Sequence, residues 1–234
     1  MDLYNRFYVG EFVEVSKNNF PDNFIDLTVT SPPYDNIRTY KGYVFDYAAM
    51  FEELFRITKP GGIVVWVVGD ATIDYDETCT SFKQALKAKE IGFKLFDTMI
   101  YHKKSGPPPS NRYKPSFEYM FVFSKGKPKT INLLRDKKNA WGGTPLFGRN
   151  SRRKTDGTLE VKDTTPIINE YGIRENVWSY VVGYMHSHKD LFAHKHPATF
   201  PEKLAEDHIL SWSNPGDLVL DPMCGSGTTV DVFG

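Results

Sequence analysis

Residues 63–68 read Ile-Val-Val-Trp-Val-Val and form the longest uninterrupted apolar run of the 234-residue chain. A strand with one face in water alternates apolar and polar residues, so this continuous run predicts a central strand covered on both faces. An amphipathic helical pattern precedes it, from about residue 47 to 58, and ends at Lys59-Pro60-Gly61-Gly62. This order is typical of a sheet between two layers of helices.

Strand and helix patterns alternate on both sides of this run. Residues 26–30 form a β-rich stretch that ends at two prolines, which cannot donate to a sheet ladder. Further strands are expected at residues 94–101, 118–123 and 218–220, and helices at residues 81–90 and from Pro201 to 210, the latter capped by Thr199 or Phe200. The sequence therefore predicts a three-layer α/β fold with a mostly parallel sheet.

Composition excludes several classes of protein. The longest apolar run is far shorter than the ~20 residues that cross a bilayer, and the charged N-terminus lacks a secretory signal, so no membrane or export role is expected. Two cysteines, Cys79 and Cys224, cannot form a disulfide framework or a cysteine-built zinc site. These features indicate a reduced, cytoplasmic setting.

The net charge of zero hides an uneven distribution. Residues 124–154 hold 10 basic side chains and one acid, which leaves 19 basic and 28 acidic residues elsewhere. Such a segment suits a polyanion, although a solvated loop explains the charge equally well. Residues 124–185 show no sustained helical or strand period, so we expect an inserted, loop-rich module there.

A glycine turn, Asp221-Pro222-Met223-Cys224-Gly225-Ser226-Gly227-Thr228-Thr229, follows the strand at 218–220. A phosphate-binding loop requires lysine where Thr228 stands, and a dinucleotide fingerprint requires glycine where Val230 stands. The acid at the strand end and the backbone amides of the turn instead suit S-adenosylmethionine. The alternative is a turn that only tightens the packing of strand against helix.

A second motif, Thr30-Ser31-Pro32-Pro33-Tyr34, lies at another strand end. The prolines fix the backbone so that the Ser31 side chain and the Pro32 carbonyl converge, and two such acceptors can bind an exocyclic amine. Tyr34 offers a flat face on which a flipped base can stack. Taken alone, Pro-Pro-Tyr is equally typical of a turn or of a polyproline ligand.

In this order the two motifs resemble those of the beta-class DNA amino-methyltransferases. Further blocks that resemble the family are Lys59–Gly62, Phe117–Lys125, Asn176-Val177-Trp178 and His196–Leu204. The resemblance implies a Rossmann-like S-adenosylmethionine-dependent methyltransferase fold. It places a catalytic half at residues 1–123, a target-recognition insertion at 124–185 and a cofactor-binding half at 186–234.

The resemblance also implies the roles of individual residues. Direct attack of a base nitrogen on the sulfonium methyl needs no cysteine nucleophile, and the catalytic residues would be Ser31, Pro32, Pro33 and Tyr34. The cofactor-binding residues would be Glu11, Thr30, Phe200, Asp221, Met223, Cys224, Gly225, Ser226, Gly227 and Thr228. Double-stranded DNA with a flipped target base would be the partner, bound through Lys137, Lys138, Arg149, Arg152, Arg153 and Lys154.

Two departures from the family stand out. Glu11 occupies a position where the family usually has aspartate after glycine. The chain also stops at Gly234, inside the helix expected after the glycine turn, so we expect the sequence to be incomplete at its C-terminus. A homodimer is compatible with the sequence.

The head of the catalytic motif favours N4-cytosine methylation of DNA in restriction–modification, because serine there resembles the cytosine-N4 members. The alternatives are methylation of adenine N6 in DNA, amino methylation of RNA or of a protein amide, and an inactive DNA-binding fragment. No carboxylate or cysteine joins the four histidines at a familiar ligand spacing, so we expect a loop or a role in approaching the base, and no metal; these are His186, His188, His194 and His196. Trp66 is expected in the core.

Overall fold

The chain folds into two compact units. The computed structural model describes residues 5–33, 45–103, 109, 111–146, 150–162, 166–181 and 201–224. Unit 1 comprises Met1–Asn132 and Asn176–Gly234, and unit 2 comprises Leu133–Glu175.

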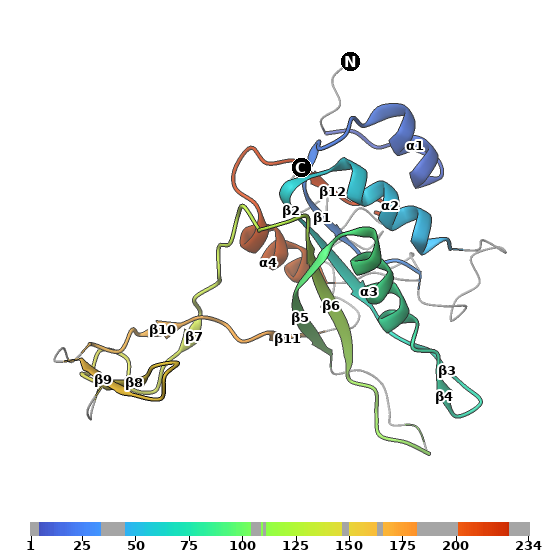
Figure 1. Ribbon diagram of the computed structural model, residues 1–234. Helices are drawn as coiled ribbons and strands as arrows, with labels where there is room; N and C mark the ends of the chain where they lie inside the picture. Colours follow the sequence, from blue (N-terminus) through green and yellow to red (C-terminus); the bar gives the residue numbers. More distant parts are fainter. Residues whose placement is uncertain are drawn as a thin grey trace. The chain divides into compact units, whose positions relative to one another are not determined.

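Unit 1 is built on a six-stranded sheet with the order β11-β5-β6-β2-β1-β12 (Figure 1). Its strands are β1 (Ile25–Thr30), β2 (Thr58–Val68), β5 (Lys94–Lys103), β6 (Phe117–Ser124), β11 (Val177–Tyr180) and β12 (Val219–Leu220). Strand β1 pairs in parallel with β2 and β12, β11 pairs in parallel with β5, and β6 runs antiparallel to β2 and β5. The expected mostly parallel sheet is confirmed.

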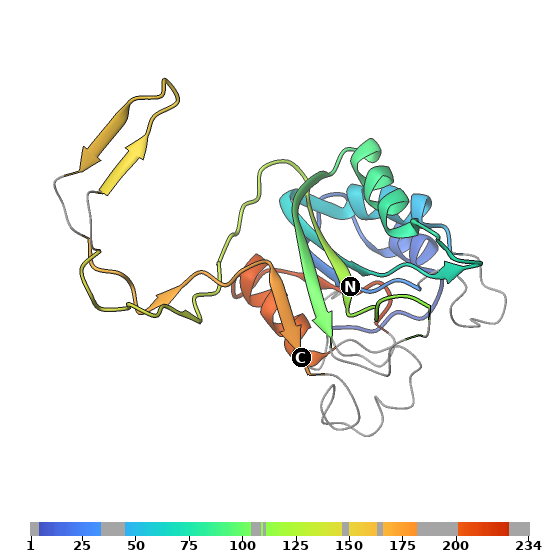
Figure 2. The ribbon, with the colours of Figure 1, turned by 90° about the horizontal axis from the view of Figure 1, so that it is seen from below.

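Helices cover both faces of this sheet. Three of them, α1 (Phe12–Asn19), α2 (Tyr47–Ile57) and α3 (Thr80–Ile91), lie on one face, and α4 (Glu202–Trp212) lies on the other (Figures 1 and 2). A small hairpin, β3 (Thr72–Ile73) with β4 (Asp76–Glu77), precedes α3. The expected three-layer architecture is confirmed.

Strand β2 is the centre of the core. All six residues from Ile63 to Val68 are at most 1% exposed. Val64, Trp66 and Val68 belong to the apolar cluster that includes the buried face of α2, and the Trp66 indole N–H donates to the Gln84 side chain at 2.8 Å. The expectations of a doubly covered strand and of a core Trp66 are both confirmed.

The glycines before this run belong to β2, not to the connection that precedes it. Between the pairs Ile25–Thr58 and Leu27–Ile63 the register shifts, so Lys59–Gly62 form a bulge. Gly61 has φ +83°, and a Cβ on Gly62 would lie 2.9 Å from the carbonyl oxygen of Asp26. Glycine is therefore required at position 61 by the left-handed backbone conformation and at position 62 by the close approach of another backbone segment.

One helix start differs from the expectation. Pro201 is the N-cap of α4 and not its first helical residue, because its backbone is extended, with φ −60° and ψ 138°. Its carbonyl accepts the Leu204 N–H at 2.9 Å. A proline suits this position, since a cap needs an acceptor and no donor. Thr199 and Phe200, the expected caps, lie outside the described residues. Helix α1 was not expected.

Unit 2, which lies within the expected loop-rich insertion, contains short antiparallel pairs of strands. Strand β7 (Lys137–Lys138) pairs with β10 (Tyr171–Gly172), and β8 (Asn150–Arg153) pairs with β9 (Leu159–Lys162). Unit 2 is shorter in sequence than the expected insertion at 124–185, because both ends of that range belong to unit 1. At the first end the Lys125 ammonium donates to the Phe55 carbonyl at 2.7 Å, and at the second end β11 joins the sheet of unit 1.

Arg56 on α2 ties the first helices to the chain between α1 and β1. Its guanidinium donates to the Glu53 carboxylate at 3.0 Å, to Asp22 at 2.6 Å and to the Phe20 carbonyl at 2.9 Å. Burial alone would raise the pKa of Glu53, but the hydrogen bonds and charge of Arg56 outweigh it and hold that pKa below its ordinary value. The folded state therefore favours the ionised carboxylate.

Replacing Arg56 with methionine is expected to lower the free energy of unfolding at neutral pH by about 2 kcal/mol, because a nearly buried carboxylate loses its partner. Because the folded-state pKa of Glu53 is depressed, this stabilisation is present above its unfolded pKa of about 4.3 and disappears as the pH falls through the folded value. Urea unfolding over this pH range measures the difference. Lys87→Met, which removes an exposed ion pair with Glu90, is the control and should change stability little.

Within the described part of the chain, no helix has the length and apolar character needed to cross a membrane.

Candidate active site

Two strand ends that are distant in sequence lie side by side in unit 1. Strands β1 and β12 are parallel neighbours, with Leu27 opposite Val219 and Thr28 opposite Leu220. Their carboxyl ends therefore meet at one edge of the sheet, which is where open α/β sheets place their ligands. The residues that follow each strand are those of the two sequence motifs.

A hydrogen bond joins the motifs directly. The Thr30 hydroxyl donates to Oδ1 of Asp221 at 3.0 Å, across a separation of 191 residues. Thr30 is fully buried, and the same oxygen also accepts the backbone N–H of Met223 at 3.0 Å. These bonds fix the carboxylate group at the edge of the sheet, half-buried and negatively charged.

The start of the Thr30–Tyr34 motif continues β1 into this edge. Pro32 is buried, and Ser31 and Pro33 on either side of it are half-buried. Ser31 is therefore one residue beyond the hydroxyl that contacts Asp221. Tyr34, the expected stacking residue, lies outside the described residues.

The environment of the cysteine beside Asp221 disfavours the thiolate form. Burial raises the pKa of the half-buried Cys224 thiol, and the nearby negative charge of Asp221 raises it further. The other cysteine, Cys79, is exposed and precedes α3. The surroundings of Cys224 therefore do not favour a chemistry that needs an activated cysteine.

Glu11 caps a helix in this fold. It is the N-cap of α1, and its carboxylate accepts the backbone N–H of Glu14 at 3.0 Å. An acidic N-cap satisfies an unpaired donor and complements the positive end of the helix. Its expected cofactor role stays a prediction.

Three polar residues at the same sheet edge were not singled out from the sequence. Asp70 follows β2 and accepts the backbone N–H of Ser81 at 2.8 Å, which anchors the start of α3. At the ends of β5 and β11, His102 Nδ1 lies 3.0 Å from the Ser179 hydroxyl. The sequence signal for Asp70 is an acid two residues beyond the central strand.

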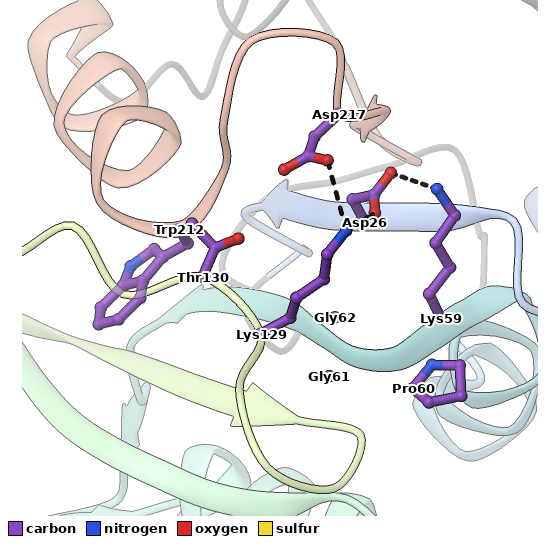
Figure 3. A pocket seen from close by; sticks show the side chains of 9 residues that line it. All are labelled: Asp26, Lys59, Pro60, Gly61, Gly62, Lys129, Thr130, Trp212 and Asp217. Atoms are coloured by element: carbon purple, nitrogen blue, oxygen red, sulfur yellow. Dashed lines mark hydrogen bonds and ion pairs between the residues drawn. The ribbon is translucent and has the colours of Figure 1, made fainter.

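A pocket of about 220 Å³ lies at the opposite, amino edge of these strands (Figure 3). Lys59 contacts Asp26 at 2.5 Å, and Lys129 lies 4.0 Å from both Asp26 and Asp217. Asp26 also accepts the backbone N–H of Leu218 at 3.0 Å, so these charges hold β12 against β1. The pocket lies at the amino ends of the strands, whereas the two motifs lie at their carboxyl ends. The candidate active site is therefore the carboxyl edge.

The expected DNA-binding side chains belong to unit 2 and differ in their surroundings. Arg152, Arg153, Lys154 and Lys138 are exposed, whereas Lys137 forms an ion pair with Glu175. The remaining expected site residues lie outside the described part of the chain: Arg149, Phe200, Gly225, Ser226, Gly227 and Thr228. Within the described residues no group of three or more His, Cys, Asp or Glu side chains could hold a metal ion.

Comparisons with known proteins agree with this geometry. Residues 25–233 match the family model described as DNA methylase. Orphan methyltransferase M.BamHII of Bacillus amyloliquefaciens is 56% identical over 214 residues, which cover 91% of this chain and 81% of M.BamHII.

Two solved structures resemble the fold. A candidate DNA modification methylase from Thermus thermophilus, in complex with S-adenosyl-L-methionine, has a TM-score of 0.57 and 25% identity, and the match covers 96% of this chain and 82% of that one. PvuII DNA methyltransferase, named as cytosine-N4-specific, has a TM-score of 0.67, with 96% of this chain and 76% of that one covered. At 21% identity this second likeness supports the fold alone.

Proposed function

The chain belongs to the N6/N4 DNA methylase family, and from that premise we propose that it transfers a methyl group from S-adenosylmethionine to the exocyclic N4 of cytosine in double-stranded DNA. The observation that carries the proposal is the bond between Thr30 and Asp221. It joins the motif suited to an exocyclic amine to the motif suited to the cofactor. One site can then hold both reactants.

The residues at the sheet edge fit the cofactor. S-adenosylmethionine carries a positive sulfonium and an ammonium group, and it supplies the activated methyl group when bound. Asp221 offers a negative charge that is half-buried and fixed by two donors, Thr30 and Met223. A cation near such a carboxylate is attracted more strongly than in open solvent. We propose Asp221, Met223, Cys224 and the glycines after them as the cofactor-binding segment.

In the proposed mechanism the catalytic motif orients the nucleophile. The Ser31 hydroxyl and the Pro32 carbonyl accept hydrogen bonds from the exocyclic amine and point its lone pair at the methyl carbon. The bound cofactor would supply its methyl group to this nitrogen and leave as S-adenosylhomocysteine, and the amine would lose a proton to solvent. Positioning supplies most of the rate, because no covalent intermediate with the protein is required.

The choice of N4-cytosine over N6-adenine rests on Ser31. Serine preceded by threonine resembles the cytosine-N4 members, whereas aspartate is commoner at this position among the adenine-N6 members. We propose Tyr34 as the stacking platform for the flipped base and residues 124–185 as the target-recognition region. A cytoplasmic location, where bacterial DNA lies, is part of the proposal.

The modified base in the product DNA distinguishes N4-cytosine from N6-adenine specificity. Plasmid DNA methylated by the protein should carry N4-methylcytosine at a fixed sequence and should lack N6-methyladenine, because serine at the head of the motif resembles the cytosine-N4 members. Sequencing that distinguishes the two modified bases measures this result. Methylation of adenine alone would leave the methyltransferase proposal standing and overturn the choice of base. Absence of both modifications, with the cofactor bound, would overturn the enzymatic proposal.

A further inference from the structure

The β8–β9 hairpin, residues 150–162 of unit 2, is a two-stranded ribbon with solvent on both faces. Strands β8 and β9 pair from Asn150–Lys162 to Arg153–Leu159, and every residue from 151 to 160 is exposed. Two-stranded hairpins are at best marginally stable by themselves in water. A ribbon exposed on both faces suits an element that completes its contacts on a partner.

The turn of this hairpin is nevertheless well ordered by local bonds. The Lys154 N–H donates to the Thr158 carbonyl at 2.8 Å, and Oδ1 of Asp156 accepts the backbone N–H of Thr158 at 2.9 Å and its hydroxyl at 2.7 Å. Gly157 supplies the positive φ of +84° that the turn needs. The two strands are thus held in one register, so their side chains have fixed faces.

Strand alternation separates two neighbouring arginines that look alike in sequence. Arg152 lies opposite Glu160, and Arg153 lies opposite Leu159. Successive residues of a strand point to opposite faces, so one face carries the Arg152–Glu160 pair and the other carries Arg153 and Leu159. These arginines cannot make equivalent contacts with a single ligand surface.

The charge of the ribbon favours a polyanionic partner. The carboxylate of Glu160 favours contact with the base edges of a nucleic acid over contact with its phosphates. The hairpin holds four basic and two acidic residues, and unit 2 holds nine basic and six acidic residues. A carboxylate that faced only phosphates would be repelled. Against a base edge it can accept a hydrogen bond from cytosine N4, while arginine binds guanine O6 and N7.

We infer that the β8–β9 hairpin enters the major groove of DNA with its Arg152–Glu160 face toward the base edges, where it reads a G·C pair. The major groove admits a two-stranded β-ribbon. Cross-strand neighbours such as Arg152 and Glu160 have Cβ atoms about 5 Å apart, close enough to read one base pair or two adjacent pairs. Arg153, on the opposite face, contacts phosphate. This inference rests on the proposal that the substrate is double-stranded DNA.

The test compares three single variants of the full chain, Arg152→Ala, Glu160→Gln and Arg153→Ala. Each protein selects duplexes from a pool with a randomised centre, and the affinity for a selected and an unrelated duplex is measured against salt concentration. Arg152→Ala should lose the preference for guanine at one position by roughly 5- to 150-fold, and Glu160→Gln should lose the preference for the cytosine nearby. Arg153→Ala should weaken binding to both duplexes alike and reduce the log–log salt slope by about 0.9.

Selection of the same sequence by wild type and by the two variants of the base-reading face would overturn the inference. So would an Arg152→Ala variant that behaves as Arg153→Ala does, or a wild-type protein that selects no sequence. Methyl transfer is measured separately on the same preparations. Its absence in wild type would contradict the proposed reaction, while the binding selection would still decide the role of the hairpin.

Discussion

Replacing Ser31 with alanine is expected to lower the single-turnover rate of methyl transfer by about 100- to 1000-fold, the usual effect of deleting one group that acts on the reacting atoms in the transition state. In the proposed mechanism the Ser31 side chain acts on the amine and not on the sulfonium, so cofactor affinity should remain near that of wild type. Rapid-quench measurement with preformed enzyme–cofactor complex separates the two quantities. The effect should therefore appear in the transfer step and not in cofactor binding.

Thr28→Val is the matched control for this variant. It removes a hydroxyl from the same strand, and Thr28 is fully buried with no hydrogen-bond partner for its Oγ1 among the described residues. The methyl group of valine fills the same space, so the transfer rate should be unchanged. A Ser31→Ala enzyme that transfers methyl as fast as this control would show that the motif is not catalytic.

The second large effect is expected from Asp221→Ala, which should weaken S-adenosylmethionine binding by about 3 kcal/mol, or roughly 100-fold. The variant removes the negative charge at the sheet edge and leaves the buried Thr30 hydroxyl without that acceptor. Calorimetric titration with the cofactor measures the loss. DNA affinity should change much less, because Asp221 lies in unit 1 and the proposed DNA-reading hairpin lies in unit 2.

Asp217→Asn provides the control at the other end of the same strand. Asp217 precedes β12, accepts the backbone N–H of Asn214 at 2.8 Å and lines the pocket at the amino edge. Its neutralisation should leave cofactor affinity near the wild-type value. An Asp221→Ala protein that binds the cofactor as tightly as Asp217→Asn would remove the glycine turn from the cofactor site.

The layers of the fold and the positions of the two motifs could be predicted from sequence because their signals are local. Six consecutive apolar residues at 63–68 require cover on both faces, and proline pairs or glycine turns end strands through their own backbone restrictions. The resemblance of the ordered motifs to the DNA amino-methyltransferases carried the family assignment. Helix α1 was missed because it is only eight residues long and contains two valines and two asparagines, which are weak helix formers.

Contacts between distant segments were decided by the tertiary structure alone. The bond between Thr30 and Asp221 depends on β1 and β12 being adjacent, which no local pattern specifies. The basic run at 124–154 is likewise divided by the fold: Lys125 packs on Phe55, while Lys137 pairs with Glu175. Basic side chains that are close in sequence form a charged surface patch only where the backbone places them on the same face. The pairing of β8 with β9 therefore places Arg152 and Arg153 on opposite faces of one ribbon.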